Sequence, residues 1–182
     1  VRSRRQRQMC IRDSPGSDSL ALENLLKGRL PLPGAEVIPD RLNDIDSVLK
    51  AKESGKIDIS VEKVVLMGHS LGALTAILAS GLKLDDQLEN RCQKVLDNLS
   101  LTNLSSLLQC QLVDITLPDR KNMENLSSII GMNSFGSFLW QKDLANQINI
   151  PLFLTGGTFD LVTPSISAVS YTHLRAHETD SY

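Results

Sequence analysis

A serine flanked by two glycines stands near the middle of the chain, in the pattern G-x-S-x-G at positions 68–72. The preceding residues 63–67, K-V-V-L-M, form a short and mostly apolar run, as in a strand buried on both faces of a parallel sheet. The following residues 71–78 are small and apolar, as in a helix packed closely on such a sheet. The order strand, tight turn, helix is typical of a nucleophilic serine held clear of the chain, whereas an isolated G-x-S-x-G is often only a surface turn.

The tight turn predicts a role for each residue of the pattern. Ser70 supplies the nucleophilic hydroxyl, and the helix that begins after it stabilises developing negative charge. The backbone N–H of Leu71 is expected to donate to the oxyanion of a tetrahedral intermediate. Gly68 and Gly72 are expected where a Cβ would collide with neighbouring backbone. His69 lies within the turn, and we expect it to be packed or solvated with its ring pointing away from the serine hydroxyl.

A serine nucleophile also needs a general base, and the base needs an acid that holds its tautomer. Asp160 is the best acid candidate because it follows the apolar stretch 149–157, at the carboxyl end of an expected parallel strand. It also comes after the serine in the chain, as this arrangement requires. The alternative role for Asp160 is a turn-capping aspartate. Asp114 and Asp119 are weaker acid candidates.

No histidine of the chain is assigned as the catalytic base. His173 and His177 follow Asp160 by only 13 and 17 residues. A parallel crossover alone takes about a dozen residues or more, and a further strand would have to come before the histidine. We therefore expect no esterase turnover from the chain as it stands.

Strand and helix patterns alternate along the chain and predict an α/β fold, with a parallel sheet, flanking helices and right-handed crossovers. The expected helices, besides the one after Ser70, are 20–28, 41–53 and 139–149, and the expected strands are 63–67, 127–132 and 149–157. Residues 30–39 carry three prolines and are expected to be irregular. The apolar face of the helix 41–53 is expected to consist of Leu42, Ile45, Val48 and Leu49.

Two leucine-rich helical stretches, 82–96 and 101–112, interrupt the alternation of strands and helices. They predict a small helical cap inserted after the nucleophile helix, at about residues 82–119, although an extra packed helical pair is the alternative. Cys92 and Cys110 both lie in this cap. A disulfide in an exported protein and two buried thiols in a cytosolic protein fit the sequence equally well.

The composition excludes several classes of protein. Hydrophobic residues make up 41% and charged residues 22% of the chain, and the formal net charge is −2, which is ordinary for a globular protein and gives no reason to expect a nucleic-acid partner. No apolar run approaches the roughly 20 residues of a membrane-spanning helix. No metal-ligand spacing and no phosphate-binding glycine loop occurs, so no cofactor is expected. The sequence leaves the compartment and the oligomeric state open.

The two ends of the chain differ in composition from the rest. Five arginines lie within residues 1–14, and both tyrosines and two of the three histidines lie within residues 169–182. Residues 4–14, R-R-Q-R-Q-M-C-I-R-D-S, resemble a translated sequencing adaptor, and residues 169–179, V-S-Y-T-H-L-R-A-H-E-T, resemble its partner. We therefore expect both ends to be non-native and the natural domain to span residues 15–168.

Two motifs of this domain resemble one known superfamily. Residues 68–72 together with 156–164, G-G-T-F-D-L-V-T-P, resemble the α/β-hydrolases, and more narrowly the bacterial dienelactone-hydrolase-like group related to platelet-activating-factor acetylhydrolases. Residues 15–19, 41–49 and 105–110 are similar to the same group. Dienelactone hydrolases proper use a cysteine nucleophile, whereas this chain has a serine. The resemblance therefore implies a related fold and not the same substrate.

The resemblance implies a partial α/β-hydrolase fold and a serine hydrolase that cleaves a carboxylic ester, with a short-acyl or lipid-like substrate. In that family pattern Ser70 forms the acyl-enzyme, the Leu71 N–H binds the oxyanion and Asp160 is the acid of the triad. Two alternatives use the same fold. One is a non-catalytic relative that binds a ligand or partner through its cap, and the other is an acyltransferase that keeps these residues and excludes water.

Overall fold

A computed structural model gives the fold of the chain. It describes residues 34–58, 62–97, 104–120, 123, 125–136, 138–140 and 148–157. The chain divides into two compact units, Val1–Pro33 and Gly34–Tyr182, and the fold described here belongs to the second. The expected helix 20–28 and the adaptor-like ends lie outside the described residues, as do Cys10, Asp160, His173 and His177.

The elements follow one another as helix, strand, helices and two further strands. In chain order they are the 3₁₀ helix η1 (Ala35–Val37), α2 (Ile38–Glu53), β1 (Val64–His69), α3 (Leu71–Ala79), α4 (Leu88–Asp97), α5 (Leu104–Cys110), β2 (Leu126–Met132) and β3 (Leu152–Thr155). The strands form a three-stranded sheet in the order β1-β2-β3, and both pairs are parallel. The expected α/β class with a parallel sheet is confirmed.

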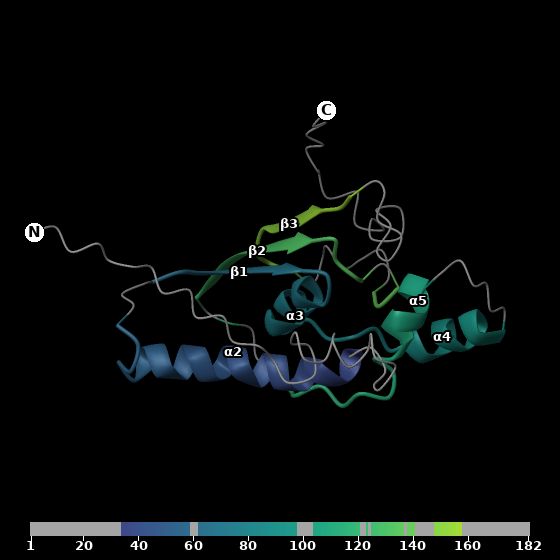
Figure 1. Cartoon of the computed structure of the whole chain (residues 1–182), viewed down its shortest axis with the longest axis horizontal. Helices are drawn as coiled ribbons and strands as arrows, with labels where there is room; N and C mark the ends of the chain where they lie inside the picture. Colours follow the sequence, from purple (N-terminus) through teal and green to yellow (C-terminus); the bar gives the residue numbers. More distant parts are fainter. Residues whose placement is uncertain are drawn as a thin grey trace, which may run out of the picture. The chain divides into compact units, whose positions relative to one another are not determined.

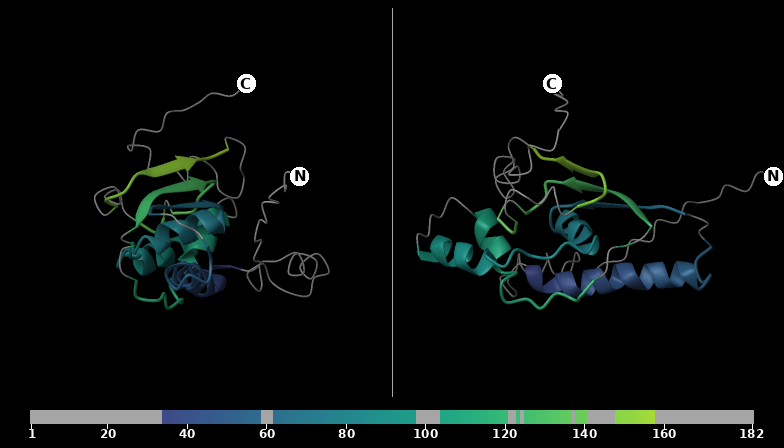
Figure 2. Two further views of the ribbon diagram at one scale, coloured as in Figure 1. Left: turned by 90° about the vertical axis from the view of Figure 1, so that its left-hand side faces the viewer. Right: turned by 180° about the vertical axis from the view of Figure 1, so that it is seen from behind.

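One face of the sheet is covered by α3, and α2 packs on the other side of α3 (Figure 1). The same order of sheet, α3 and α2 is visible from behind (Figure 2). Leu66, Ile129 and Leu152 are register partners on the covered face and belong to the hydrophobic core. Every residue of α3 from Ala73 to Ala79 is buried. Such a helix is apolar all round because it lies between two layers.

The opposite side of the sheet, which we call the outer face, is open. Met67, Ile130 and Phe153 are register partners in a row across the three strands. Met67 is 64% exposed and Phe153 58%, and Val65 beside them is 51% exposed. The prediction that the strand before Ser70 is buried on both faces is therefore wrong. A valine-rich run shows that a strand has an apolar side, but it does not show what covers each side.

The helix α2 begins earlier than predicted. Residues 35–37 already form η1, and α2 starts at Ile38 with Pro39 in its first turn. Proline is tolerated there because its missing N–H would have no intrahelical partner. The prediction of an irregular stretch is therefore wrong for residues 35–39. Ile38 and Leu42 are buried in the core, whereas Val48 is 50% exposed, so the predicted apolar face of this helix is narrower than its sequence indicates.

The two leucine-rich stretches each contain a helix, as predicted, but α4 and α5 are both shorter than those stretches. Residues 82–87 are not helical, and Leu139 and Trp140 lie in a turn and not at the start of a helix. The structure settles the open question about the cysteines, because a disulfide joins Cys92 of α4 to Cys110 of α5. None of the helices in the described ranges is both long and apolar enough to cross a membrane.

The disulfide generates a prediction about stability. In a Cys10→Ser background, replacing Cys92 and Cys110 by serine is expected to lower the free energy of unfolding by about 3 kcal/mol, because the cross-link closes a loop of 18 residues in the unfolded chain. Urea denaturation followed by tryptophan fluorescence measures the change. Reductant should destabilise the Cys10→Ser protein and leave the triple variant unaffected. Equal sensitivity of the two proteins to reductant would contradict the prediction.

Candidate active site

The candidate nucleophile lies between a strand and a helix without any intervening loop. His69 is the last residue of β1, and Leu71 is the first residue of α3. Ser70 connects them with φ 53° and ψ −120°, a left-handed conformation that a non-glycine residue adopts only under strain. The predicted order of strand, tight turn and helix is confirmed. Backbone strain of this kind persists only where the surrounding structure holds the residue in place, and it is concentrated at functional sites.

The close contact between β1 and α3 depends on Gly68. A Cβ added at this position would overlap the carbonyl group of Gly72 and would lie 2.6 Å from the backbone nitrogen of Ala73. Only glycine therefore lets the first turn of α3 rest on the end of β1. The same steric prediction is wrong for Gly72, where an added Cβ would meet nothing within 4 Å.

Gly131 lies beside Gly68 in the register of β1 and β2. A Cβ at Gly131 would lie 2.8 Å from the Leu154 side chain and 3.4 Å from the Cβ of Ala73. Two adjacent strands thus lack side chains where the first turn of α3 crosses them. Sequence reasoning did not single out Gly131, although a glycine within an apolar strand pattern is a signal of close backbone approach.

The hydroxyl of Ser70 does not cap α3, the helix that follows it. Ser70 occupies the N-cap of α3, where serine side chains usually accept a hydrogen bond from the N–H of the second or third helical residue. Here the side chain makes no such bond. The backbone N–H of Ser70 donates to the Met132 carbonyl oxygen at 2.8 Å, which ties the turn to the end of β2. The Ala73 N–H donates to the Ser70 carbonyl oxygen at 3.0 Å, whereas the N–H groups of Leu71 and Gly72, the first two residues of α3, have no carbonyl within the helix to donate to and can bind negative charge.

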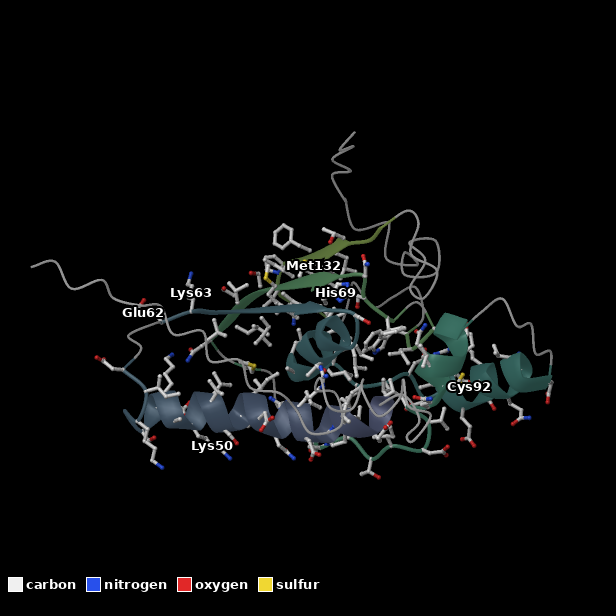
Figure 3. All side chains as sticks on the ribbon, viewed as in Figure 1. Lys50, Glu62, Lys63, His69, Cys92 and Met132 are labelled. Atoms are coloured by element: carbon white, nitrogen blue, oxygen red, sulfur yellow. A yellow bond between two sulfur atoms is a disulfide. The ribbon has the colours of Figure 1, made fainter. Side chains whose placement is uncertain are left out.

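His69 lies at the carboxyl edge of the sheet, beside its register partner Met132 (Figure 3). Its side chain is exposed, like those of Val65 and Met67 at the alternate positions of β1. Because side chains alternate along a strand, His69 belongs to the outer face, and α3 packs against the other face. No hydrogen bond joins it to Ser70 in the part of the chain that the structure describes. Of the two predicted environments for His69, packed or solvated, the structure shows the solvated one.

The carboxyl ends of β2 and β3 are joined by Asn133. Its backbone N–H donates to the Thr155 carbonyl at 2.7 Å, and its side-chain Oδ1 accepts from the N–H of Gly157 at 3.0 Å. Asn133 has φ 46°, a conformation that asparagine tolerates better than most residues. Gly157 is three residues before Asp160, the predicted acid, which lies outside the described residues. In the sequence, the asparagine that directly follows the strand pattern 127–132 is the feature from which this contact could have been predicted.

Asp119, one of the two weaker acid candidates, is not near the turn around Ser70. Asp119 is exposed and pairs at 3.5 Å with Lys83, which is also exposed and lies four residues beyond the last residue of α3. The helix is about 13 Å long at 1.5 Å per residue, so this pair lies at the end of α3 opposite to Ser70. Asp114 is an exposed residue in the turn that follows α5. The position of Asp119 gives no support to a role beside the serine.

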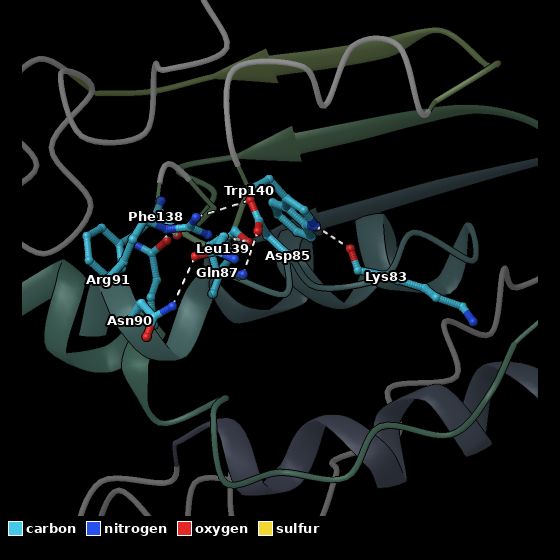
Figure 4. Close-up of polar contacts among 9 residues, drawn as sticks. Lys83, Asp85, Gln87, Asn90, Arg91, Phe138, Leu139 and Trp140 are labelled. Atoms are coloured by element: carbon cyan, nitrogen blue, oxygen red, sulfur yellow. Dashed lines mark hydrogen bonds and ion pairs between the residues drawn. The ribbon is translucent and has the colours of Figure 1, made fainter. Parts of the chain in front are cut away.

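Helices α4 and α5 are tied to the segment that follows β2 (Figure 4). Arg91 of α4 donates to the carbonyl oxygens of Phe138 and Leu139 at 3.1 and 3.3 Å, and it pairs with Asp85 at 3.1 Å. From α5, the buried Gln109 accepts a bond from the Phe138 N–H at 2.9 Å. These contacts attach the α4–α5 pair to the chain leaving the carboxyl end of β2, the same end of the sheet that carries Ser70.

Two of the cavities in the described part of the chain have walls that do not include Ser70. The larger, about 400 Å³, lies at the amino ends of β2 and β3, between residues 80–83 and 148–150. Within the described ranges, no three histidine, cysteine, aspartate or glutamate side chains gather closely enough to hold a metal ion. The chain matches no protein-family model, no curated protein and no solved structure.

The two glycines of the pattern provide a matched pair of variants. Gly68→Ala is expected to lower the free energy of unfolding by about 3 kcal/mol, because its Cβ overlaps backbone that cannot move without displacing α3. Gly72→Ala should change the same quantity by no more than about 0.5 kcal/mol, because its Cβ enters open space. Urea denaturation compares the two. Similar losses for both variants would show that α3 does not rest on β1 as described.

The backbone strain at Ser70 can be measured with two substitutions. Ser70→Gly is expected to be more stable than Ser70→Ala by about 1 kcal/mol, because only glycine adopts φ 53° without strain. Ser80 at the other end of α3 is the control, since its φ of −70° is ordinary helical backbone. There the alanine variant should be the more stable one. The same order at both positions would contradict strain at Ser70.

Proposed function

We propose that residues 15–168 are part of an α/β-hydrolase and that the natural protein cleaves carboxylic esters with Ser70 as its nucleophile. The observation that carries the proposal is the conformation of Ser70. A serine held at φ 53° at the start of a helix, with a hydroxyl that does not cap that helix, has a strained geometry that no structural role of the side chain explains. The parallel sheet supports the proposal, because α/β folds gather their sites at the carboxyl ends of such strands.

The proposed reaction has two steps. The Ser70 oxygen attacks the ester carbonyl carbon while a general base takes the hydroxyl proton, and the Leu71 N–H donates to the oxyanion that forms. The base then gives its proton to the leaving alcohol, and an acyl-enzyme remains on Ser70. Water, deprotonated by the same base, hydrolyses this acyl-enzyme and regenerates the serine.

Asp160 is proposed as the acid that orients the base. The bond from Gly157 to the Asn133 side chain fixes the chain three residues before Asp160 at the same edge of the sheet as Ser70, which supports this assignment. The base itself is proposed to come from a histidine of the natural protein that this sequence does not contain, because His69 belongs to the outer face. A short-acyl or lipid-like substrate fits the leucine-rich cap tied to this edge.

Labelling with a fluorophosphonate probe tests the proposal on the natural protein that contains residues 15–168. The probe is expected to modify Ser70 stoichiometrically, because the activated hydroxyl attacks phosphorus as it would attack an ester carbonyl. Peptide mass spectrometry locates the label. Ser70→Ala should abolish labelling, and Ser80→Ala, at the other end of the same helix, should retain it.

The outcome also separates the alternatives. A well-folded natural protein that takes no label would reject the hydrolase and favour the non-catalytic relative that binds a ligand through its cap. If Ser70 is labelled, product analysis with an ester and an added alcohol distinguishes hydrolysis from acyl transfer. The free acid is expected from a hydrolase and the new ester from an acyltransferase.

A further inference from the structure

Two residues at the carboxyl edge of the sheet share an unusual backbone conformation. Ser70 has φ 53° and Asn133 has φ 46°, and no other non-glycine residue in the described ranges has a positive φ. Each directly follows a strand, β1 or β2, and the last residues of these strands, His69 and Met132, are register partners. The two strained residues are therefore neighbours at the edge where the proposed reaction takes place.

Backbone hydrogen bonds join these neighbours to the end of β3. The Ser70 N–H donates to the Met132 carbonyl oxygen at 2.8 Å, and the Asn133 N–H donates to the Thr155 carbonyl oxygen at 2.7 Å. Both bonds continue the parallel pairing of the sheet past the ends of the strands. Because Ser70 is two strand spacings away from β3, the chain that leaves β3 begins about 10 Å from it.

The Asn133 side chain extends this link beyond the strands. Its Oδ1 accepts the N–H of Gly157 at 3.0 Å. Since β3 has already ended at Thr155, a side chain here supplies the acceptor that a neighbouring strand would otherwise supply. Glycine adopts a positive φ freely, but only a residue such as asparagine combines that conformation with a side-chain acceptor.

We propose that Asn133 is a positioning residue for the acid of the site, an assignment that rests on the proposed hydrolase function. Asp160 follows Gly157 by three residues, a length of chain that spans at most about 11 Å. Fixing Gly157 therefore keeps the Asp160 carboxylate near the carboxyl edge, where the general base needs it. In this scheme Asn133 acts only through Asp160 and contacts neither the ester nor the base.

The chemistry of the base gives this role a signature. A carboxylate beside an imidazole stabilises the protonated ring and raises its pKa, and it holds the tautomer that accepts the serine proton. Loss of the Asn133 acceptor moves the carboxylate away, so the maximal rate falls and the half-maximal pH falls with the pKa of the base. His69, the only titratable side chain of the described strands, belongs to the outer face and is the same in every variant.

Exchange of the Gly157 amide hydrogen tests the contact in the 182-residue chain. Asn133→Gly keeps the positive φ without strain and removes the acceptor, whereas Asn133→Asp keeps an acceptor at the same place. Measured by ¹⁵N-resolved NMR, the Gly157 amide should exchange about tenfold faster in Asn133→Gly, because one hydrogen bond protects it. Asn133→Asp should retain the slow exchange. Equal exchange in all three proteins would overturn the inference.

Kinetics of the natural protein that contains residues 15–168 test the role in the reaction. With p-nitrophenyl acetate, Asn133→Gly is expected to lower kcat/KM about tenfold, since a misplacement of about 1 Å can cost a hundredfold. The low-pH limb of the kcat/KM profile should move about 0.5 pH units lower. Asn133→Asp should restore most of the rate. Ser80→Ala, at the far end of α3, is the control and should alter neither the rate nor the profile.

The Asp160→Ala background supplies the decisive comparison. There Asn133→Gly should change kcat/KM by less than about twofold, because the group through which it acts is gone, whereas independent effects would multiply. Equal losses in both backgrounds, or a lower rate with an unmoved pH limb, would overturn the inference. A natural protein whose Ser70 takes no fluorophosphonate label would overturn the hydrolase proposal and this role together. A labelled, active protein that is unaffected by Asn133→Gly would overturn this role alone.

Discussion

The described part of the molecule depends on one close contact, the first turn of α3 resting on the end of β1. Gly68 permits this contact because any larger residue would overlap the carbonyl of Gly72. The chain can then turn from strand to helix within one residue, and Ser70 takes the left-handed conformation that such a turn requires. The bond from Ser70 N–H to the Met132 carbonyl fixes the same residue to the neighbouring strand. The position of Ser70, the strain in its backbone and the absence of a capping bond from its hydroxyl all follow from the contact between α3 and β1.

The sequence predicted the features that local chemistry determines and missed those that depend on distant partners. The turn around Ser70 was predictable because an apolar run, a glycine-flanked serine and a small-residue helix are contiguous. The exposure of Met67 was not, since a strand pattern does not show what covers each side of a sheet. Asn133 was missed because its partner, Gly157, is 24 positions away. The spacing of Cys92 and Cys110 allowed a disulfide but did not decide it.

Long-range polar contacts add to the apolar packing that places α4, α5 and residues 115–120 against the core. Arg91 and Gln109 attach α4 and α5 to the chain after β2, while Arg120 attaches residues 115–120 to α2 through Asp46. Guanidinium groups suit this task, because their planar fork binds a carboxylate through two hydrogen bonds at once. Burial of such pairs adds little net stability, yet loss of one partner leaves an uncompensated charge. They therefore fix where segments lie more than how firmly they fold.

The open outer face has a practical consequence for work with the protein. Met67 and Phe153 expose apolar side chains on β1 and β3, the two edge strands of the sheet. Exposed apolar surfaces of two molecules associate more strongly when the solvent makes their hydration less favourable. Sulfate and phosphate at high concentration have that effect, because they are excluded from protein surfaces. Salting-out steps would thus favour association between molecules, and buffers of low ionic strength would keep them apart.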